Sequence, residues 1–475
     1  MPGRPPLNLQ LIGLIVYLVL MLGIGAWAAR RIRNEGDYLL AGRQLGPLLV
    51  AFSVYATWFG AETILGSPGS IYRDGLAGGS ADPFGYGLAL IGTGAIFAIP
   101  LWKRGLTTYA DLFRQRYSIG VERLMVLIYV PSSVIWGAAQ IRAFGQVVGT
   151  VSGLELEVAI AVASAFVIGY TLLGGLMADA VTDLVQGLGL AVGLVILWFG
   201  IMHQAGGFSE SLALVDPARF NPLGAGGRSW LEVLEEWAVP VGGSMLTAEI
   251  VQRILGARSP SVARWGTLGG AAMYIGIGLI PVYLGLVGPV LAPGLTDPEQ
   301  VVPTLARQYL GTVGYVMFAG ALVSIILSTV DSTLLAAGGF ISHNLVASAF
   351  PGLSDTARLR VARLSVFVFG VVSTALALGA ESIYSLVLTA SAFGSAGIFV
   401  VSCFGLFTRV GGPASAHAAI VTGLGVWAWG EYAAGWTAPF VTALVAATVA
   451  YLAAARARTA SSVTSSASCM RASHR

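Results

Sequence analysis

Charged side chains are scarce in this sequence of 475 residues: Asp, Glu, Lys and Arg together make up 10%, against roughly 25% in soluble domains. Hydrophobic residues make up 56%, and the mean hydropathy is +0.79. So few polar residues cannot cover the surface of a water-soluble globule. The composition excludes a soluble enzyme, a nucleic-acid-binding protein and a disordered scaffold, and it predicts a protein that crosses a membrane many times.

Cysteine and histidine are also rare. The two cysteines, Cys403 and Cys469, supply neither a disulfide framework nor a metal cluster, and the four histidines share no ligand spacing. No motif pairs a nucleophile with a base, and no phosphate-binding loop occurs. We therefore expect neither an enzyme nor coupling to ATP. The net charge of +3 does not identify a partner, because the position of each charge matters more than the sum.

Long runs without charge are abundant, and a membrane-spanning helix needs about 20 mainly apolar residues. Twelve runs of 17 or more residues occur, at 9–29, 44–61, 83–102, 124–141, 158–178, 184–202, 265–296, 308–330, 364–380, 382–408, 410–430 and 432–455. A shorter candidate at 237–248 contains Pro240 and Gly242–Gly243. The sequence therefore predicts thirteen transmembrane helices.

The basic residues predict the orientation of these helices. With the N-terminus outside and the C-terminus inside, twenty of the 26 Lys and Arg residues are cytoplasmic, five are outside, and Arg142 lies within a helix. The run 9–29 is expected to be a retained anchor rather than a cleaved signal peptide, because its basic cluster follows the apolar stretch. The tail 456–475, rich in Ser, Ala and Arg, is expected to be disordered.

The ten helices after the anchor divide into two sets of five. Since five is odd, the second set enters the membrane in the opposite orientation, which gives an inverted repeat. The first helix of each set is interrupted, one by glycines and a proline between 60 and 69, the other by Pro240 and Gly242–Gly243. Matched interruptions indicate a transporter's binding site, because unwound carbonyls can replace an ion's hydration shell. Alternatively, these glycines only permit close helix packing.

The sequence thus predicts an all-α membrane protein with six segments. They are an anchor helix with a cytoplasmic link at 1–43, a first five-helix unit at 44–202, an extracellular loop at 203–230, a second, inverted unit at 231–408, two further helices at 409–455 and the tail at 456–475.

The run 308–330 and the residues after it carry a polar stripe. Ser324, Ser328, Asp331 and Ser332 recur at i, i+4, i+7 and i+8 and so share one helix face, with Thr329 beside Ser328. A carboxylate at membrane depth indicates an ion path or a proton relay, and hydroxyl and carbonyl oxygens are hard ligands that suit Na⁺. Alternatively, the hydroxyls bond back to their own helix.

A second carboxylate, Asp183, precedes the run 184–202 and lies toward the same membrane side as Asp331. Asp179, four residues earlier, is the candidate for a solvated carboxylate. The alternative for Asp183 is an ordinary charge at a loop-to-helix boundary.

Six segments in this sequence resemble the sodium:solute symporter family, in the right order and over most of the chain. They read GDYLLAGR, GSPGSIY, TYADLFRQRY, GGLMADAVTDLVQG, QRILGARS and LSTVDST. The resemblance implies a LeuT-type fold of inverted five-helix repeats, with uptake of a small organic solute coupled to Na⁺.

The resemblance also implies ligands for sodium. The family's usual sodium site maps onto the carbonyls of Ala56, Phe59 and Ile325 and the hydroxyls of Ser328 and Thr329. A second site, present in some members, maps onto Asp183, Ser328, Asp331 and Ser332. Relatives often have a smaller residue at position 325, which a carbonyl ligand tolerates.

Within the family, the sequence is most similar to the choline transporters, which surround a quaternary ammonium with aromatic rings. Trp58, Tyr86 and Trp136 match three positions of that cage, although each could instead be a packing residue. The segment 244–249 has no aromatic residue at the fourth position. The solute class therefore stays open between a choline-like amine, an amino acid and a betaine.

Other polar residues beside these aromatics are candidate solute contacts, namely Gln140, Thr247 and Glu249. Gln140 shares a helix face with Trp136, whereas Arg142 points about 120° away from it. Glu62 and Arg142 either pair as an outer gate or bind the two charged ends of a zwitterion.

The leading hypothesis is a sodium-coupled symporter in the plasma membrane that imports one small solute by alternating access. A proton-coupled symporter of the same fold is an alternative. A solute sensor would be expected to carry an output domain, yet about 20 residues follow the last helix. A passive channel would not need the paired hydroxyls at 328 and 329. The number of Na⁺ ions, one or two, and the oligomeric state cannot be read from the sequence.

Overall fold

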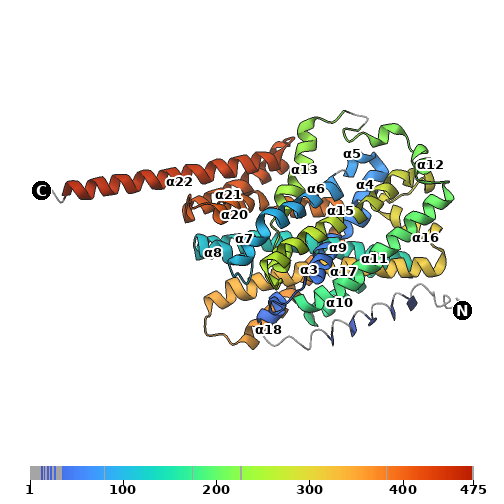
Figure 1. Cartoon of the computed structure of the whole chain (residues 1–475), viewed down its shortest axis with the longest axis horizontal. Coiled ribbons are helices and arrows are strands. Elements are labelled where there is room, and N and C mark those ends of the chain that lie inside the picture. The colour runs from blue at the N-terminus through green and yellow to red at the C-terminus, as the bar shows by residue number, and fades with distance from the viewer. Residues whose placement is uncertain are drawn as a thin grey trace.

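Helices make up almost all of the regular structure in the described part of the chain. The computed structural model describes residues 35–472 apart from 80, 174, 225–226 and 381, together with short pieces between 12 and 27. The predicted anchor helix at 9–29 therefore lies largely outside the described residues. The helices pack side by side in one bundle, and the last helix, α22, extends away from it (Figure 1).

The first half of the chain forms the helices α2 to α12, with one 3-10 helix (η1) and two π-helical segments (η2, η3) among them. They are α2 (Glu35–Leu40), η1 (Ala41–Arg43), α3 (Pro47–Trp58), η2 (Glu62–Gly66), α4 (Ser67–Asp74), α5 (Leu76–Gly79), α6 (Ala81–Gly92), η3 (Thr93–Phe97), α7 (Ala98–Lys103), α8 (Asp111–Arg116), α9 (Ile119–Ser152), α10 (Leu156–Leu173), α11 (Leu176–Gln204) and α12 (Phe208–Ala213).

The second half has the same character. Its elements are η4 (Pro217–Phe220), α13 (Trp230–Ser244), α14 (Ala248–Gly256), α15 (Pro260–Leu291), η5 (Pro298–Gln300), α16 (Val301–Tyr309), α17 (Gly311–Gly339), η6 (Phe340–Ala347), α18 (Asp355–Gly379), α19 (Ile383–Ala392), α20 (Ser395–Phe407), α21 (Pro413–Trp429), η7 (Gly430–Ala434) and α22 (Pro439–Ala472).

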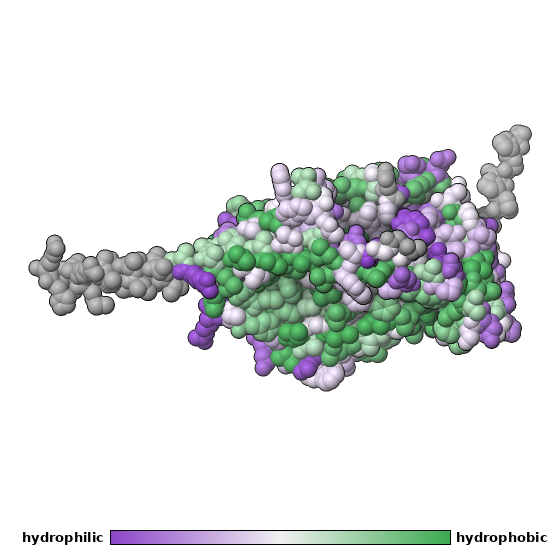
Figure 2. All heavy atoms as spheres, turned by 90° about the horizontal axis from the view of Figure 1, so that it is seen from above, coloured by the Kyte–Doolittle hydropathy of each residue, from purple (hydrophilic) through white to green (hydrophobic). Residues whose placement is uncertain are grey.

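Seven helices of the described chain are long and apolar enough to cross a membrane, or nine if each of two bent helix pairs counts as one crossing. Hydrophobic side chains cover the middle of the face in Figure 2, and hydrophilic ones gather toward its ends. This pattern suits a protein embedded in lipid. The predicted runs 158–178 and 410–430 form helices of only 18 and 17 residues, so the count of thirteen crossings stays a prediction.

The first interrupted helix bends where the sequence predicts. α3 ends at Trp58, η2 begins at Glu62, and the two halves of the pair are inclined at 56°. The break frees the backbone N–H of Ala61, which donates to Oε1 of Gln140 at 2.8 Å. Such a partner is needed because the membrane interior offers no water to an unpaired backbone group.

The second interruption falls later in the chain than predicted. α13 continues through Pro240 and the two glycines to Ser244, and the helix is broken only at 245–247. Gly243 instead allows α13 to approach α19, because a Cβ at this position would collide with the carbonyl oxygen of Ser391.

Side chains from other helices hold this second break open. The hydroxyl of Thr93 donates to the carbonyl of Met245, and the N–H of Ala248 donates to the hydroxyl of Tyr129 at 2.7 Å. The position of the break is therefore set by tertiary partners and not by the local helix breakers.

Small residues bring the central helices together. α15 packs along α3, where a Cβ at Gly270 would lie 2.7 Å from the side chain of Val54. α17 packs against α9, α11 and α3. Close approach through glycine is a common way for transmembrane helices to associate. The polar stripe of α17 consequently faces the interrupted end of α3 inside the bundle.

The end of the chain differs from expectation. α22 continues as a helix through 456–472, the segment for which disorder was predicted. This segment contains several alanines and neither glycine nor proline, so nothing in its composition stops a helix that has already started.

Candidate functional site

The interrupted end of α3 meets the polar stripe of α17. The hydroxyl of Thr329 donates to the carbonyl of Thr57 at 3.1 Å and to that of Ile325 at 3.2 Å. Because α3 ends at Trp58, the carbonyls that follow Tyr55 lack their usual helical donors. Of the five residues predicted for the first sodium site, four lie in these two helices and Phe59 directly follows α3. All five are at most 2% exposed: Ala56, Phe59, Ile325, Ser328 and Thr329.

Asp183 connects α11 to both of these helices. One of its carboxylate oxygens accepts from the hydroxyl of Ser53 on α3 at 2.5 Å, and the other accepts from the hydroxyl of Ser328 on α17. Asp183 is fully buried, seven residues inside α11. The alternative of an ordinary charge at a loop-to-helix boundary is therefore wrong.

A buried arginine that the sequence analysis did not select lies beside Asp183. Arg253 of α14 forms a salt bridge with Asp179 and donates to the hydroxyls of Ser332 at 2.5 Å and Ser53 at 3.1 Å. Its Nη2 is 3.8 Å from Oδ2 of Asp183. Asp179 is fully buried. The prediction of a solvated Asp179 is wrong, because α14 supplies a cation inside the bundle.

The residues predicted for a second sodium site have separate partners. Ser328 is bonded to Asp183, whereas Ser332 is bonded to Arg253 and to Asp179 at 3.0 Å. Asp331 lies near Tyr170 of α10, and its Oδ2 has no hydrogen-bond partner in the described part of the chain. The arginine thus occupies the neighbourhood in which a second cation was expected.

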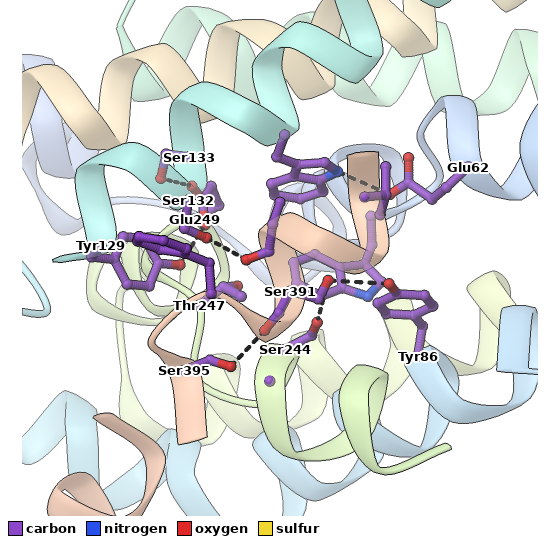
Figure 3. A pocket seen from close by; sticks show the side chains of 16 residues that line it. Glu62, Tyr86, Tyr129, Ser132, Ser133, Ser244, Thr247, Glu249, Ser391 and Ser395 are labelled. Carbon is purple, nitrogen blue, oxygen red and sulfur yellow. Dashed lines mark hydrogen bonds between the residues drawn. The ribbon is translucent and has the colours of Figure 1, made fainter. Parts of the chain in front are cut away.

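A cavity of about 30 Å³ lies between the two interrupted helices (Figure 3). Most of the predicted solute contacts line it, as does one of the two gate candidates: Trp58, Tyr86, Trp136, Thr247, Glu249 and Glu62. Gln140 is not among the lining residues.

Three aromatic rings form one wall of this cavity. The ring of Trp58 lies 5.3 Å from that of Trp136 and 6.4 Å from that of Tyr86, both edge to face. The hydroxyl of Tyr86 is 3.1 Å from that of Ser391 on α19. The indole N–H of Trp58 has no hydrogen-bond partner within the described residues. Aromatic faces in this arrangement can attract a cation.

Glu62 lines the cavity beside this wall and is 3% exposed. Its two carboxylate oxygens accept from the indole N–H of Trp136 at 3.2 Å and the amide of Gln140 at 2.7 Å. Gln140 therefore positions Glu62 and the break, in place of the direct solute contact that we predicted. Arg142 donates to the carbonyl of Ala377 on α18 at 3.3 Å. Glu62 and Arg142 thus have different partners, and they do not form the pair that was considered as an outer gate.

Glu249 is the second carboxylate in the cavity and is 1% exposed. It accepts hydrogen bonds from the hydroxyls of Tyr129 and Ser133 on α9, both at 3.1 Å. The hydroxyl of Thr247, two residues earlier, also lines the cavity and has no partner in the described structure. No lysine, arginine or histidine is among the described residues that line this cavity.

Some of these residues were missed in the sequence but left a signal there. Tyr129 and Ser133 precede Trp136 by seven and three residues, so they lie on the same helix face. Arg253 lies in the segment IVQRIL, which is otherwise mainly apolar, four positions after Glu249, which is about one helical turn. Ser391 left no comparable signal, because its position depends on the packing of α19 against α9 and α13.

The family model described as sodium:solute symporter family matches residues 38–423 of this chain. The chain belongs to the sodium:solute symporter family. The human high affinity choline transporter 1 is 30% identical over 406 residues, covering 79% of this chain and 69% of that protein. The sodium/pantothenate symporter of Escherichia coli is 25% identical over 383 residues, covering 77% and 78%. The resemblance seen in the sequence is confirmed.

Solved structures show the same fold. A Na⁺-coupled sialic acid symporter, in a substrate-bound outward-open state, matches with a TM-score of 0.79 at 20% identity, covering 94% of this chain and 96% of that one. The nucleobase-cation-symport-1 family transporter Mhp1, in a closed conformation, matches with a TM-score of 0.56 at 14% identity. As a sodium:solute symporter, the protein is a multi-pass membrane transporter and not an enzyme, and Na⁺ is its coupling ion.

Proposed function

We propose that this sodium:solute symporter imports a small organic cation together with Na⁺ by alternating access. The observation that carries the proposal is the charge of the cavity. Glu62 and Glu249 are its charged lining residues, and no basic side chain is among the described residues that accompany them. A cationic solute neutralises buried carboxylates, whereas an anionic one adds a further charge without a partner.

This charge distribution selects among the solutes considered from the sequence. A choline-like amine meets two carboxylates and three aromatic rings, which is the chemistry of cation binding. The carboxylate of an amino acid or betaine would find no basic partner among the lining residues. Pantothenate and sialic acid, which the names of related proteins mention, are carboxylic acids, so this cavity favours a different solute class.

The proposed sodium site lies at the junction of α3 and α17. Its ligands are the carbonyls of Ala56, Phe59 and Ile325 and the hydroxyls of Ser328 and Thr329. Na⁺ bound there would link the end of α3 to α17. It would thereby fix the orientation of Trp58, which follows Ala56 by two residues and lies at the cavity wall. We propose one Na⁺ per cycle, because Arg253 already supplies a cation beside Asp179 and Asp183.

We also propose thirteen helices, with the N-terminus outside and the C-terminus inside the cell membrane, and a LeuT-type inverted repeat. Two observations support this arrangement. The excess of basic residues in the loops assigned to the cytoplasm favours the orientation. The interruptions after α3 and after α13 fall in the first helix of each five-helix unit, as inverted repeats require.

The test is solute uptake into proteoliposomes under an imposed inward Na⁺ gradient, with pooled labelled amines, amino acids and carboxylates. We expect one amine to accumulate with Na⁺ and accumulation to be lost in the Ser328→Ala/Thr329→Ala double variant. Accumulation of a carboxylate would contradict the proposed solute class. Accumulation driven by a proton gradient alone would contradict the sodium site, and solute binding without any accumulation would favour a sensor.

A further inference from the structure

We infer that the solute carries two positive charges, and that the cavity accommodates a short linear diamine whose ammonium ends meet Glu62 and Glu249. This inference rests on the proposed function and narrows its solute class. It starts from the number of buried carboxylates. A solute with one charge compensates only one of the two, so the other must stay protonated or carry an unpaired buried charge, which is costly. A dication compensates both.

The two carboxylates are held apart by one helix. Four side chains of α9 bind them, Tyr129 and Ser133 at Glu249, and Trp136 and Gln140 at Glu62. The midpoints of these two pairs, positions 131 and 138, are separated by seven residues, which corresponds to about 10 Å along an α-helix. In Figure 3 the two glutamates approach the cavity from different sides and from different elements.

This spacing gives an approximate length for the solute. A charge-assisted hydrogen bond between nitrogen and a carboxylate oxygen is about 2.8 Å long. If the two carboxylates lie as far apart as the positions of α9 that bind them, two such bonds leave roughly 5 Å between the nitrogens, a distance that about three or four methylene groups span at ordinary bond lengths. The rings of Trp58, Tyr86 and Trp136 line the cavity and offer apolar faces to the carbon chain.

Both carboxylates have room for a further donor. Each oxygen of Glu62 and Glu249 accepts one hydrogen bond from the protein, and an ionised carboxylate offers about four acceptor positions in all. An ammonium also brings more than one N–H. The hydroxyl of Thr247, which has no partner in the described structure, lies beside Glu249 as a further acceptor. A quaternary ammonium has no N–H and would leave these acceptors unused.

The first test uses the wild-type protein, purified in detergent with Na⁺. Isothermal titration compares α,ω-diamines of two to eight carbons with monoamines of equal length and with choline. We expect affinity to be highest at three or four carbons and at least about tenfold above that of the matching monoamine, as one added charge-assisted hydrogen bond predicts. Equal affinity for diamines and monoamines would overturn the inference, while Na⁺-driven uptake of a monoamine would still support the proposed function. A failure of every amine to bind, with uptake of a carboxylate, would overturn both.

The second test uses Glu62→Gln and Glu249→Gln, which keep the size of each side chain. Each is expected to abolish the tenfold preference for diamines and to change monoamine affinity by less than about threefold. Glu299→Gln is the matched control, since Glu299 is a buried glutamate that binds Ser382 and Ile383 outside the cavity. Unchanged diamine affinity in both cavity variants would overturn the inference. If a variant does not fold, the chain-length series with the wild type decides.

Discussion

Arg253 and Asp179 form a salt bridge in which both side chains are closed to solvent, with 0% and 1% of their surfaces exposed. Asp183 lies 3.8 Å from the same guanidinium, so one cation serves two carboxylates that come from the neighbouring helix α11. Removing one member of a buried ion pair leaves the other charge without compensation, which typically costs about 3–5 kcal/mol.

Arg253→Gln should therefore destabilise the protein by about 3 kcal/mol or more. Thermal unfolding in detergent measures the change. Adding Asp179→Asn to Arg253→Gln should restore part of the stability, because the double variant no longer buries that uncompensated carboxylate. A single variant as stable as the wild type would show that the salt bridge makes no net contribution.

Ser328→Ala and Thr329→Ala should each weaken Na⁺ binding if their hydroxyls are ligands. We expect the Na⁺ concentration for half-maximal uptake to rise by about tenfold, as the loss of a strong polar contact predicts. Thr333→Ala is the control, because the Thr333 hydroxyl donates to Val330 within its own helix at 2.8 Å. Equal Na⁺ dependence in all three variants would place the sodium site elsewhere.

Thr247→Val should raise the KM for the solute by about two- to tenfold, the effect of one lost hydrogen bond. The hydroxyl of Thr247 has no partner in the described structure, so this change breaks no hydrogen bond within the protein there, and stability should be unchanged. Thr93→Val provides the contrast. Its hydroxyl supports the carbonyl of Met245 at the second break, and its loss should lower the melting temperature. An unchanged KM for Thr247→Val would remove Thr247 from the solute contacts.

Acid should destabilise the end of the bundle where Glu35 and Asp111 flank His343. His343 lies 3.3 Å from Glu35 and 3.5 Å from Asp111. Burial raises the pKa of each carboxyl, but hydrogen bonds and the charge of His343 together lower it by more. Both pKa values therefore lie below their ordinary values of 4.5 and 3.8. Between the folded and the unfolded pKa values, the unfolded chain binds more protons than the folded one. The stabilisation is therefore complete at a pH above the ordinary pKa values, and it is lost as the pH falls through the lower pKa values of the folded state.

The melting temperature measured from pH 7 down to pH 3 checks this expectation. His343→Gln should be less stable than the wild type at pH 7, and the difference should shrink below about pH 4 as the carboxyls become protonated. A difference that stays constant over the whole range would mean that His343 acts through packing alone.

Local patterns were enough to predict part of the candidate site. The breakers between 60 and 69 indicated the bend after α3, and the spacing of polar residues indicated that they share one face of α17. Both signals lie within one segment, so the sequence displays them directly. The wall formed by Trp58, Tyr86 and Trp136 followed from the family resemblance.

Features that depend on distant partners could not be predicted in this way. Pro240 suggested a break that the structure places after Ser244, because the freed backbone groups find their partners on η3 and α9. Likewise, the sequence singled out Asp183 but gave no means of pairing Asp179 with Arg253, which is 74 residues away on another helix. Pairing across helices is decided by packing, which periodicity does not record.

One helix, α9, contacts both cavity carboxylates and both helix interruptions. Gln140 donates to Glu62 and accepts from the N–H of Ala61. Tyr129 donates to Glu249 and accepts from the N–H of Ala248. A single-residue insertion between these two positions would rotate one set of contacts by about 100° relative to the other. Side chains in the intervening segment that face away from the cavity can be exchanged, but the number of residues in it cannot. The interval from Tyr129 to Gln140 is eleven positions long. Insertions and deletions within it should therefore disrupt function.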